Sequence, residues 1–200
     1  MHSPRIHALA AFAVAACVVT ACSVSTTSDT QQSTTDDRPV DLLHDRGAAA
    51  RAIAAIERRL GAAPARAREI LIYPEYMDVE AQDPKIPEHI DEYEWRDDSV
   101  SGPEPVHLSG PQEEVDASLF PTTAVQWRDI PDIVREVETR ARHARPTRIE
   151  DAAASYLIVD RSTSSEDDGR VEISIYLNGP RRSGNAELTA SGEILTLNVS

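Results

Sequence analysis

Residues 171–177 read VEISIYL, and they carry the cleanest alternation of apolar and polar side chains in the chain. Successive side chains of a β-strand point to opposite faces, so this alternation gathers the aliphatic residues on one face. The segment therefore predicts a strand whose inward face is buried against a helix layer. Its inward residues are Val171, Ile173, Ile175 and Leu177.

The surrounding sequence predicts one helix and three further strands. Residues 131–143 (PDIVREVETRARH) have helical spacing, with Asp129 placed to cap the helix and Ile133, Val137 and Ala141 as its apolar stripe. Strands are expected at residues 154–160, 185–190 and 194–199, the last two as a hairpin. The second half of the chain thus reads as a helix followed by four strands.

The first half shows a shorter version of this order. Residues 48–60 are rich in helix formers and end at Gly61. Residues 69–81 predict a strand bent at Pro74, with Leu71, Tyr73, Met77, Val79 and Ala81 in alternation. Residues 90–96 predict a second strand, a short strand is possible at 106–108, and 112–126 are expected to form a loop around Phe120.

These elements predict an α+β fold made of two tandem units, residues 39–111 and 112–200. Each unit is one helix followed by an antiparallel β-meander, with the helices packed on one face of the sheet. The pattern resembles the PepSY-like and beta-lactamase-inhibitor-protein-like domains. That resemblance implies a free sheet face and an inhibitory, sensing or ligand-holding role.

The N-terminal residues 1–21 predict a secretory signal peptide. Residues 8–19 form an apolar run of 12 residues, too short for a spanning helix, which needs about 20. The next residues, Val19-Thr20-Ala21-Cys22, resemble the lipobox of bacterial lipoproteins. The resemblance implies transfer of a diacylglyceryl group to the Cys22 thiol, with palmitate among the fatty-acyl chains, cleavage before Cys22 and anchoring to the extracytoplasmic face of the cell membrane. Residues 22–38 are rich in Ser and Thr and predict a disordered tether.

Composition and motifs narrow the function. The chain has 34 acidic and 20 basic residues, a formal charge of −14, which opposes nucleic-acid binding. Cys17 leaves with the leader and Cys22 is the lipidation site, so no other thiol is expected. No catalytic motif is present, and the histidines are expected on the surface. We therefore expect no enzyme activity, no cofactor and no metal. The histidines outside the leader are His44, His89, His107 and His143.

The segment 75–98 is the candidate binding region because it holds ten acidic residues. On paired strands these acids would share faces, which suits a cationic or protein partner or a weak Ca²⁺ site. The alternative is an exposed sheet face on which Tyr93 and Trp95 simply pack against a helix. Arg181-Arg182 form a basic turn, either simply solvated or facing a lipid phosphate or an acidic partner. The candidate patch is Tyr76, Asp78, Glu80, Asp91, Tyr93 and Trp95.

Three classes of function stay open at this point. A non-catalytic binding, sensing or inhibitory lipoprotein is the first, a cell-envelope hydrolase the second, and a purely structural envelope protein the third. A contiguous apolar or aromatic patch on the free sheet face would favour the first over the third.

Overall fold

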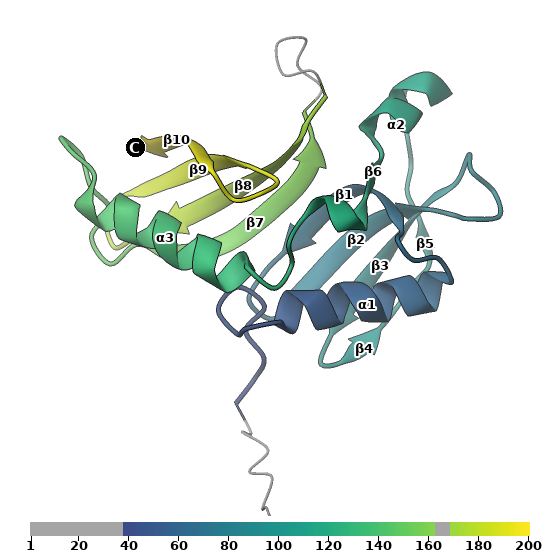
Figure 1. Cartoon of the computed structure of the whole chain (residues 1–200), viewed down its shortest axis with the longest axis horizontal. Coiled ribbons are helices and arrows are strands. Elements are labelled where there is room, and N and C mark those ends of the chain that lie inside the picture. The colour runs from purple at the N-terminus through teal and green to yellow at the C-terminus, as the bar shows by residue number, and fades with distance from the viewer. Residues whose placement is uncertain (1–37, 163–168) are drawn as a thin grey trace, which may run out of the picture. The chain divides into compact units, whose positions relative to one another are not determined.

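A computed structural model describes residues 38–162 and 169–200 (Figure 1). The leader, Cys22, nearly all of the predicted tether and the acidic turn at 163–168 lie outside the described residues. The described residues form three α-helices and ten strands in one antiparallel sheet. The elements are α1 (Ala48–Leu60), β1 (Arg66–Ile72), β2 (Tyr76–Gln82), β3 (Ile90–Arg96), β4 (Ser99–Val100), β5 (Glu104–Pro105), α2 (Gln112–Ser118), β6 (Phe120–Pro121), a 3₁₀ turn (Thr122–Ala124), α3 (Ile130–His143), β7 (Ala153–Arg161), β8 (Val171–Asn178), β9 (Ser183–Thr189) and β10 (Ile194–Val199).

The strands lie side by side in the order β10-β9-β8-β7-β1-β2-β3-β4, with β5 paired to β3 and β6 paired to β1. Two meanders therefore meet where β1 pairs antiparallel with β7. The α+β class is confirmed. No helix in the described part of the chain is both long and apolar enough to cross a bilayer.

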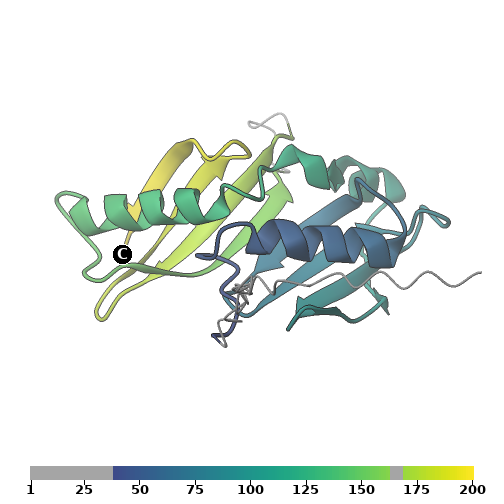
Figure 2. The same cartoon turned by 60° about the horizontal axis from the view of Figure 1, so that its bottom comes forward.

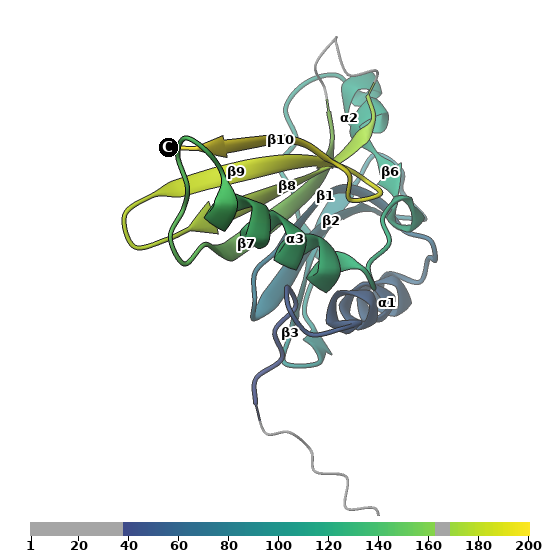
Figure 3. The same ribbon diagram turned by 60° about the vertical axis from the view of Figure 1, so that its left-hand side comes forward.

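The strand at 171–177 and its neighbours are confirmed. In β8, Ile173, Ile175 and Leu177 are buried, while Val171, at the start of the strand, is partly exposed. Strands β7, β9 and β10 and helix α3 coincide with their predictions to within a few residues. Figure 3 shows α3 lying across these four strands.

One face of the sheet forms the main core. Helix α1 contacts β2, β3 and β4, and α3 contacts β7, β8 and β10; Figure 2 shows both helices on the same side of the sheet. Strand pairing aligns buried residues in a continuous row on this side, which removes their apolar surface from water. That row is Tyr93, Val79, Ile70, Val159, Ile173 and Leu188, each at most 5% exposed.

The two long helices form for the reasons that the sequence indicates. In α1, Ala49, Ala52, Ile53 and Ile56 are buried, and Gly61 ends the helix in the left-handed region at φ 80°. Helix α3 differs in two details, because the Asp129 side chain makes no capping hydrogen bond and the buried stripe includes Val134 in place of the partly exposed Ile133.

The single bent strand predicted at 69–81 is wrong. The chain reverses at residues 73–75, so β1 and β2 form a hairpin. Pro74 has no N–H to donate to a ladder and suits a turn, where its carbonyl accepts a bond from Leu42 N–H at 2.8 Å. The reversal also changes the faces: Ile70 and Ile72 are buried, whereas Leu71 points to the opposite side.

The expected loop at 112–126 is also wrong, since it contains α2, β6 and the 3₁₀ turn, although Phe120 is fully buried as expected. The short strand lies at 104–105, and Val106 and Leu108 instead pack on a second apolar cluster of Ile90, Val115 and Leu119. Ile90 lies on the same side of β3 as Glu92 and Glu94. Helix α2 therefore covers one end of the face opposite α1 and α3, which departs from the prediction that all helices lie on one face.

Candidate binding face of the sheet

Four of the five tyrosines form a stacked row on the side of the sheet opposite α1 and α3, called here the open face. The ring centroids of Tyr76 and Tyr73 are 4.5 Å apart, those of Tyr73 and Tyr156 are 5.2 Å apart, and those of Tyr156 and Tyr176 are 4.4 Å apart. The Arg96 guanidinium lies 4.3 Å from the Tyr76 centroid and extends the row onto β3. The row thus runs from β3 to β8.

Strand pairing explains why these rings meet. Tyr76 lies opposite Arg96 in the β2–β3 pair, and Tyr156 lies opposite Tyr176 in the β7–β8 pair. Tyr73 follows β1 and donates its backbone N–H to the Tyr76 carbonyl at 2.9 Å. Stacked rings on neighbouring strands stabilise the pairing and leave a polar hydroxyl on each side chain. All four tyrosines are half-buried.

A second row on the open face consists of carboxylates. Strand pairing places Glu92 opposite Glu80, Glu80 opposite Glu69, Glu69 opposite Asp160 and Asp160 opposite Glu172. Two of the five have arginine partners: Arg68 pairs with Glu80, and Arg170 pairs with Glu172 at 2.9 Å. Five aligned acids with two cations leave this side of the face negative.

A middle row lies between the tyrosines and the carboxylates. It contains Glu94 opposite Asp78, with Leu71, Ile158 and Ser174 continuing the row on the next three strands. The pKa of Asp78 is raised to about 6, mainly by burial and further by the charges of Glu92 and Glu94, while the charge of Arg96 opposes these effects. Burial and then the charge of Glu69 also raise the pKa of Asp160, against an opposing effect of Arg68. An approaching cation would lower the raised pKa of these carboxyls and so favour their ionised form.

The structure divides the predicted patch between the two faces. Tyr76, Asp78 and Glu80 lie on the open face, whereas Tyr93 and Trp95 are 5% and 2% exposed in the helix-covered core. The two aromatic residues therefore pack against the helix layer, as the alternative interpretation held. Asp91 lies on the same side of β3 as these two residues. Glu92, Glu94 and Arg96 occupy the open face in their place.

Sequence reasoning missed the partners that complete the open face. Tyr156 and Tyr176 alternate with buried residues, so their outward direction could be read from the pattern. Their contact with Tyr73 could not be read, because it depends on the pairing of β1 with β7, two strands far apart in the chain.

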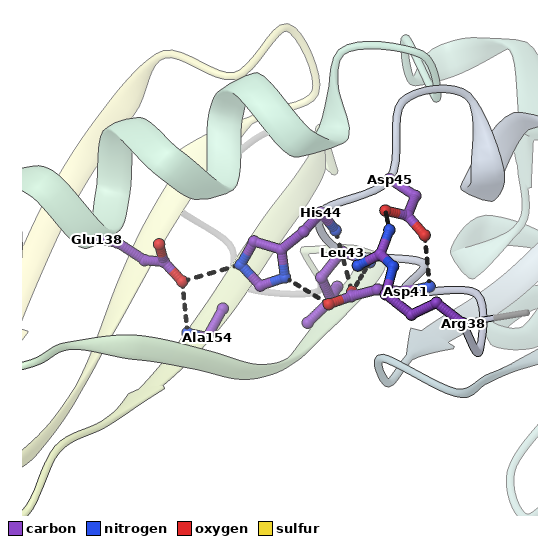
Figure 4. A network of polar contacts seen from close by, with 7 residues as sticks. All are labelled: Arg38, Asp41, Leu43, His44, Asp45, Glu138 and Ala154. Atoms are coloured by element: carbon purple, nitrogen blue, oxygen red, sulfur yellow. Dashed lines mark hydrogen bonds and ion pairs between the residues drawn. The ribbon is translucent and has the colours of Figure 1, made fainter. Parts of the chain in front are cut away.

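His44 forms a second polar site, on the helix side of the molecule (Figure 4). Its Nδ1 lies 2.9 Å from Asp41 Oδ2 and its Nε2 lies 3.1 Å from Glu138 Oε1. The same Glu138 oxygen accepts the Ala154 N–H at 2.9 Å. This bridge ties the segment before α1 to α3 and β7.

Opposing effects act on the pKa of His44. Burial alone would lower the pKa, but the hydrogen bond and charge of Glu138, together with those of Asp41, outweigh burial and raise it above its ordinary value. His44 is thus a partly exposed histidine whose two ring nitrogens both have carboxylate partners, while His89, His107 and His143 are exposed as expected. Within residues 38–162 and 169–200, no three His, Cys, Asp or Glu side chains are grouped so that they could hold a metal ion.

The described chain is thus an α+β protein in which two helices cover one face of an antiparallel sheet, and stacked tyrosines and carboxylates occupy the other. No protein-family model matches the sequence. No curated protein matches it either. Among solved structures, the fold is similar to that of a candidate lipoprotein from Clostridium difficile 630, with a TM-score of 0.54 and 9% identity over 82% of this chain and 100% of that chain. At this identity the likeness concerns the fold alone.

Proposed function

We propose that this chain is an extracytoplasmic lipoprotein, anchored to the cell membrane through a lipid on Cys22, and that it acts as a non-catalytic binding module. The apolar run at 8–19 and the sequence Val19-Thr20-Ala21-Cys22 support the anchor. A similar fold occurs in a candidate lipoprotein. We also propose that residues 39–111 and 112–200 are tandem units, since each contains a helix followed by a meander and the two meanders join at β1–β7.

The tyrosine row is the observation that carries the binding proposal. A contiguous aromatic strip on the free side of a sheet favours a binding surface over a purely structural one. Aromatic faces attract cations, and the contact between Arg96 and Tyr76 is an example within the chain itself. The adjoining carboxylates supply the negative charge for the same partner. The proposed partner is therefore a protein segment that carries Lys or Arg.

The arrangement of these groups supports recognition rather than hydrolysis. The tyrosines and acids follow neighbouring strands across a surface, and the five strands β3, β2, β1, β7 and β8 each contribute, within the strand or directly after it, one residue to the tyrosine row extended by Arg96 and one to the carboxylate row. A hydrolase instead needs a nucleophile, a base and an oxyanion site converging within hydrogen-bond reach of one reacting atom. A spread of repeated groups suits an extended partner.

Site-specific photo-crosslinking in the cell envelope tests the binding face. The photoreactive residue replaces Ser174 on the open face or, as control, Arg140 on the outer side of α3; both positions are at least partly exposed. We expect an adduct from position 174 whose partner peptide is rich in Lys or Arg, with less adduct when Tyr176→Ala is added. Equal labelling from both positions, or an acidic partner peptide, contradicts the proposal.

The anchor has its own test. Replacing Cys22 by Ser removes the thiol that would carry the lipid, so Cys22→Ser protein should stay unprocessed or leave the membrane fraction. Fractionation and mass spectrometry of the N-terminus measure this, with Cys17→Ser as the matched control. A Cys22→Ser protein that is still processed and membrane-bound like the wild type would show that the anchor lies elsewhere.

A further inference from the structure

A basic hollow lies at the turn between β8 and β9, in a chain whose formal charge is −14. It has a volume of about 350 Å³ and is lined by Pro146, Thr147, Arg148, Glu150, Arg181 and Arg182. Three arginines and one glutamate give its lining a formal charge of +2. Its size falls within the range of small-ligand sites.

Two of these arginines are available for a ligand. Arg148 donates to the Glu150 carboxylate at 3.2 Å. Arg181 and Arg182 are exposed, and no acidic group of the described residues lies within ion-pair distance of either. Most other arginines in the described part of the chain donate to a carboxylate or a carbonyl, so Arg181 and Arg182 differ from the majority.

The two loops that carry the arginines are held rigidly against each other. A Cβ on Gly179 would meet the Glu150 carbonyl oxygen at 2.5 Å and the Ile149 side chain at 2.6 Å, so only glycine permits this approach. Ile149 is fully buried, and its N–H donates to the Ala141 carbonyl at 3.1 Å. The Gly179 N–H donates to the Arg182 carbonyl at 2.9 Å and closes the turn.

We propose that this hollow, formed by Arg148, Arg181 and Arg182, binds a dianionic phosphate group. The planar guanidinium matches phosphate oxygens with two parallel hydrogen bonds, and such charge-assisted bonds are the strong ones. A formal charge of +2 balances a phosphate monoester. Loops that are already fixed spend little ordering free energy on binding. The site is independent of the open face and of its proposed partner.

Calorimetric titration of the full detergent-solubilised chain tests the site at constant ionic strength. Two probes separate the sources of the phosphate: inorganic phosphate represents a free anion, and short-chain phosphatidic acid represents a lipid headgroup. The test variant is Arg181→Gln/Arg182→Gln. The control is Arg58→Gln/Arg128→Gln, which removes two exposed arginines elsewhere and changes the net charge equally.

We expect the test variant to bind the effective probe about tenfold more weakly or worse, while the control binds like the wild type. Binding of phosphatidic acid alone assigns the site to a lipid headgroup. Binding of inorganic phosphate, with or without the lipid, assigns it to the phosphate group itself. No binding of either probe, or an equal loss in test variant and control, overturns the proposal.

Discussion

The two faces of the sheet are built from the same strands, yet they treat polar groups in opposite ways. On the helix face, aliphatic and aromatic side chains exclude water, and the buried carboxylate of Glu138 on α3 has His44 and the Ala154 N–H as partners. On the open face, Asp78 lies near Glu92 and Glu94, and its pKa rises to about 6. The buried carboxylate of the helix face has hydrogen-bond partners, whereas on the open face carboxylates outnumber their arginine partners.

This difference indicates where the folding free energy comes from. Burial of the helix face supplies the stabilisation, at about 25 cal/mol per Å² of apolar surface. The open face adds like-charge repulsion, which lowers stability. The like-charged carboxylates of the open face lower the stability of the isolated chain, but a cationic partner could neutralise them. Functional surfaces commonly lower stability in this way.

The largest expected effect comes from placing an aspartate at each of two adjacent positions in β8, one on each face of the sheet. Ile173 is fully buried, whereas Ser174, the next residue, lies on the open face. Ile173→Asp would place an unpaired charge in the core and cost several kcal/mol, of a total of about 5–15, so we expect this variant to be largely unfolded. Ser174→Asp adds one acid opposite Glu187 and should cost less than about 1 kcal/mol.

Circular dichroism and thermal melting of both variants measure the contrast. A similar loss of melting temperature in the two, or a larger loss for Ser174→Asp, would refute the assignment of the faces. A further pair, Ile175→Asp and Tyr176→Asp, repeats the comparison one step along the strand, although loss of the Tyr176 ring also removes a stacking contact.

The helix face could be predicted more fully than the open face, for a physical reason. Alternation along β8 and helical spacing along α1 are local patterns, and both describe contact with one apolar layer. The hairpin at Pro74 was missed because alternation alone does not distinguish a bent strand from two strands joined by a turn. Helix α2 was missed because it is short and buries only Val115 among its own residues.

The open face depends on which strands become neighbours. Tyr76, Asp78 and Glu80 were identified from one acidic segment, but the tyrosine row also needs β7 and β8. Tyr93 and Trp95 are close to the patch in sequence, but their side chains point to the opposite side of β3 from those of Glu92 and Glu94. The bridge made by His44 joins residues 94 positions apart, and no local pattern indicates it.

A smaller effect sharpens the comparison on the open face. Because the pKa of Asp78 is about 6 in the folded chain and about 3.8 in the unfolded chain, the folded state retains the proton more strongly. The wild type therefore loses stability as the pH rises from about 4 to about 6. Asp78→Asn removes this loss and should gain about 1 kcal/mol above about pH 6, after discounting for solvent screening, and nothing below about pH 4.

Urea denaturation at about pH 7.5 and about pH 4 checks the sign. Glu113→Gln, in the exposed first turn of α2, is the matched control and should leave the free energy of unfolding unchanged at both values. If Asp78→Asn destabilises the protein at the higher pH, the carboxylate is stabilised by a favourable interaction, and the description of a charge-accumulating face is wrong.

The smallest expected effect comes from the helix side and is a loss of stability that is greatest at low pH. Since Glu138 and Asp41 hold the pKa of His44 above its ordinary value of about 6.5, the protonated imidazole stabilises the fold. That stabilisation is fully present below about pH 6.5 and is lost as the pH rises through the folded pKa. His44→Gln should therefore cost about 0.5 kcal/mol near pH 6 and less near pH 9, since the side chain is partly exposed to solvent.

Urea denaturation at the two pH values measures the difference, and His143→Gln, at an exposed histidine, serves as control. A cost that grows with pH would mean that the neutral imidazole is the stabilising form, so that Glu138 depends on a hydrogen bond from His44 and not on the charge of its imidazolium. The two variants should therefore differ in the sign of their effect: Asp78→Asn stabilises the fold above about pH 6, because burial and like charges disfavour that carboxylate, whereas His44→Gln destabilises the fold at low pH, because Glu138 and Asp41 favour the imidazolium.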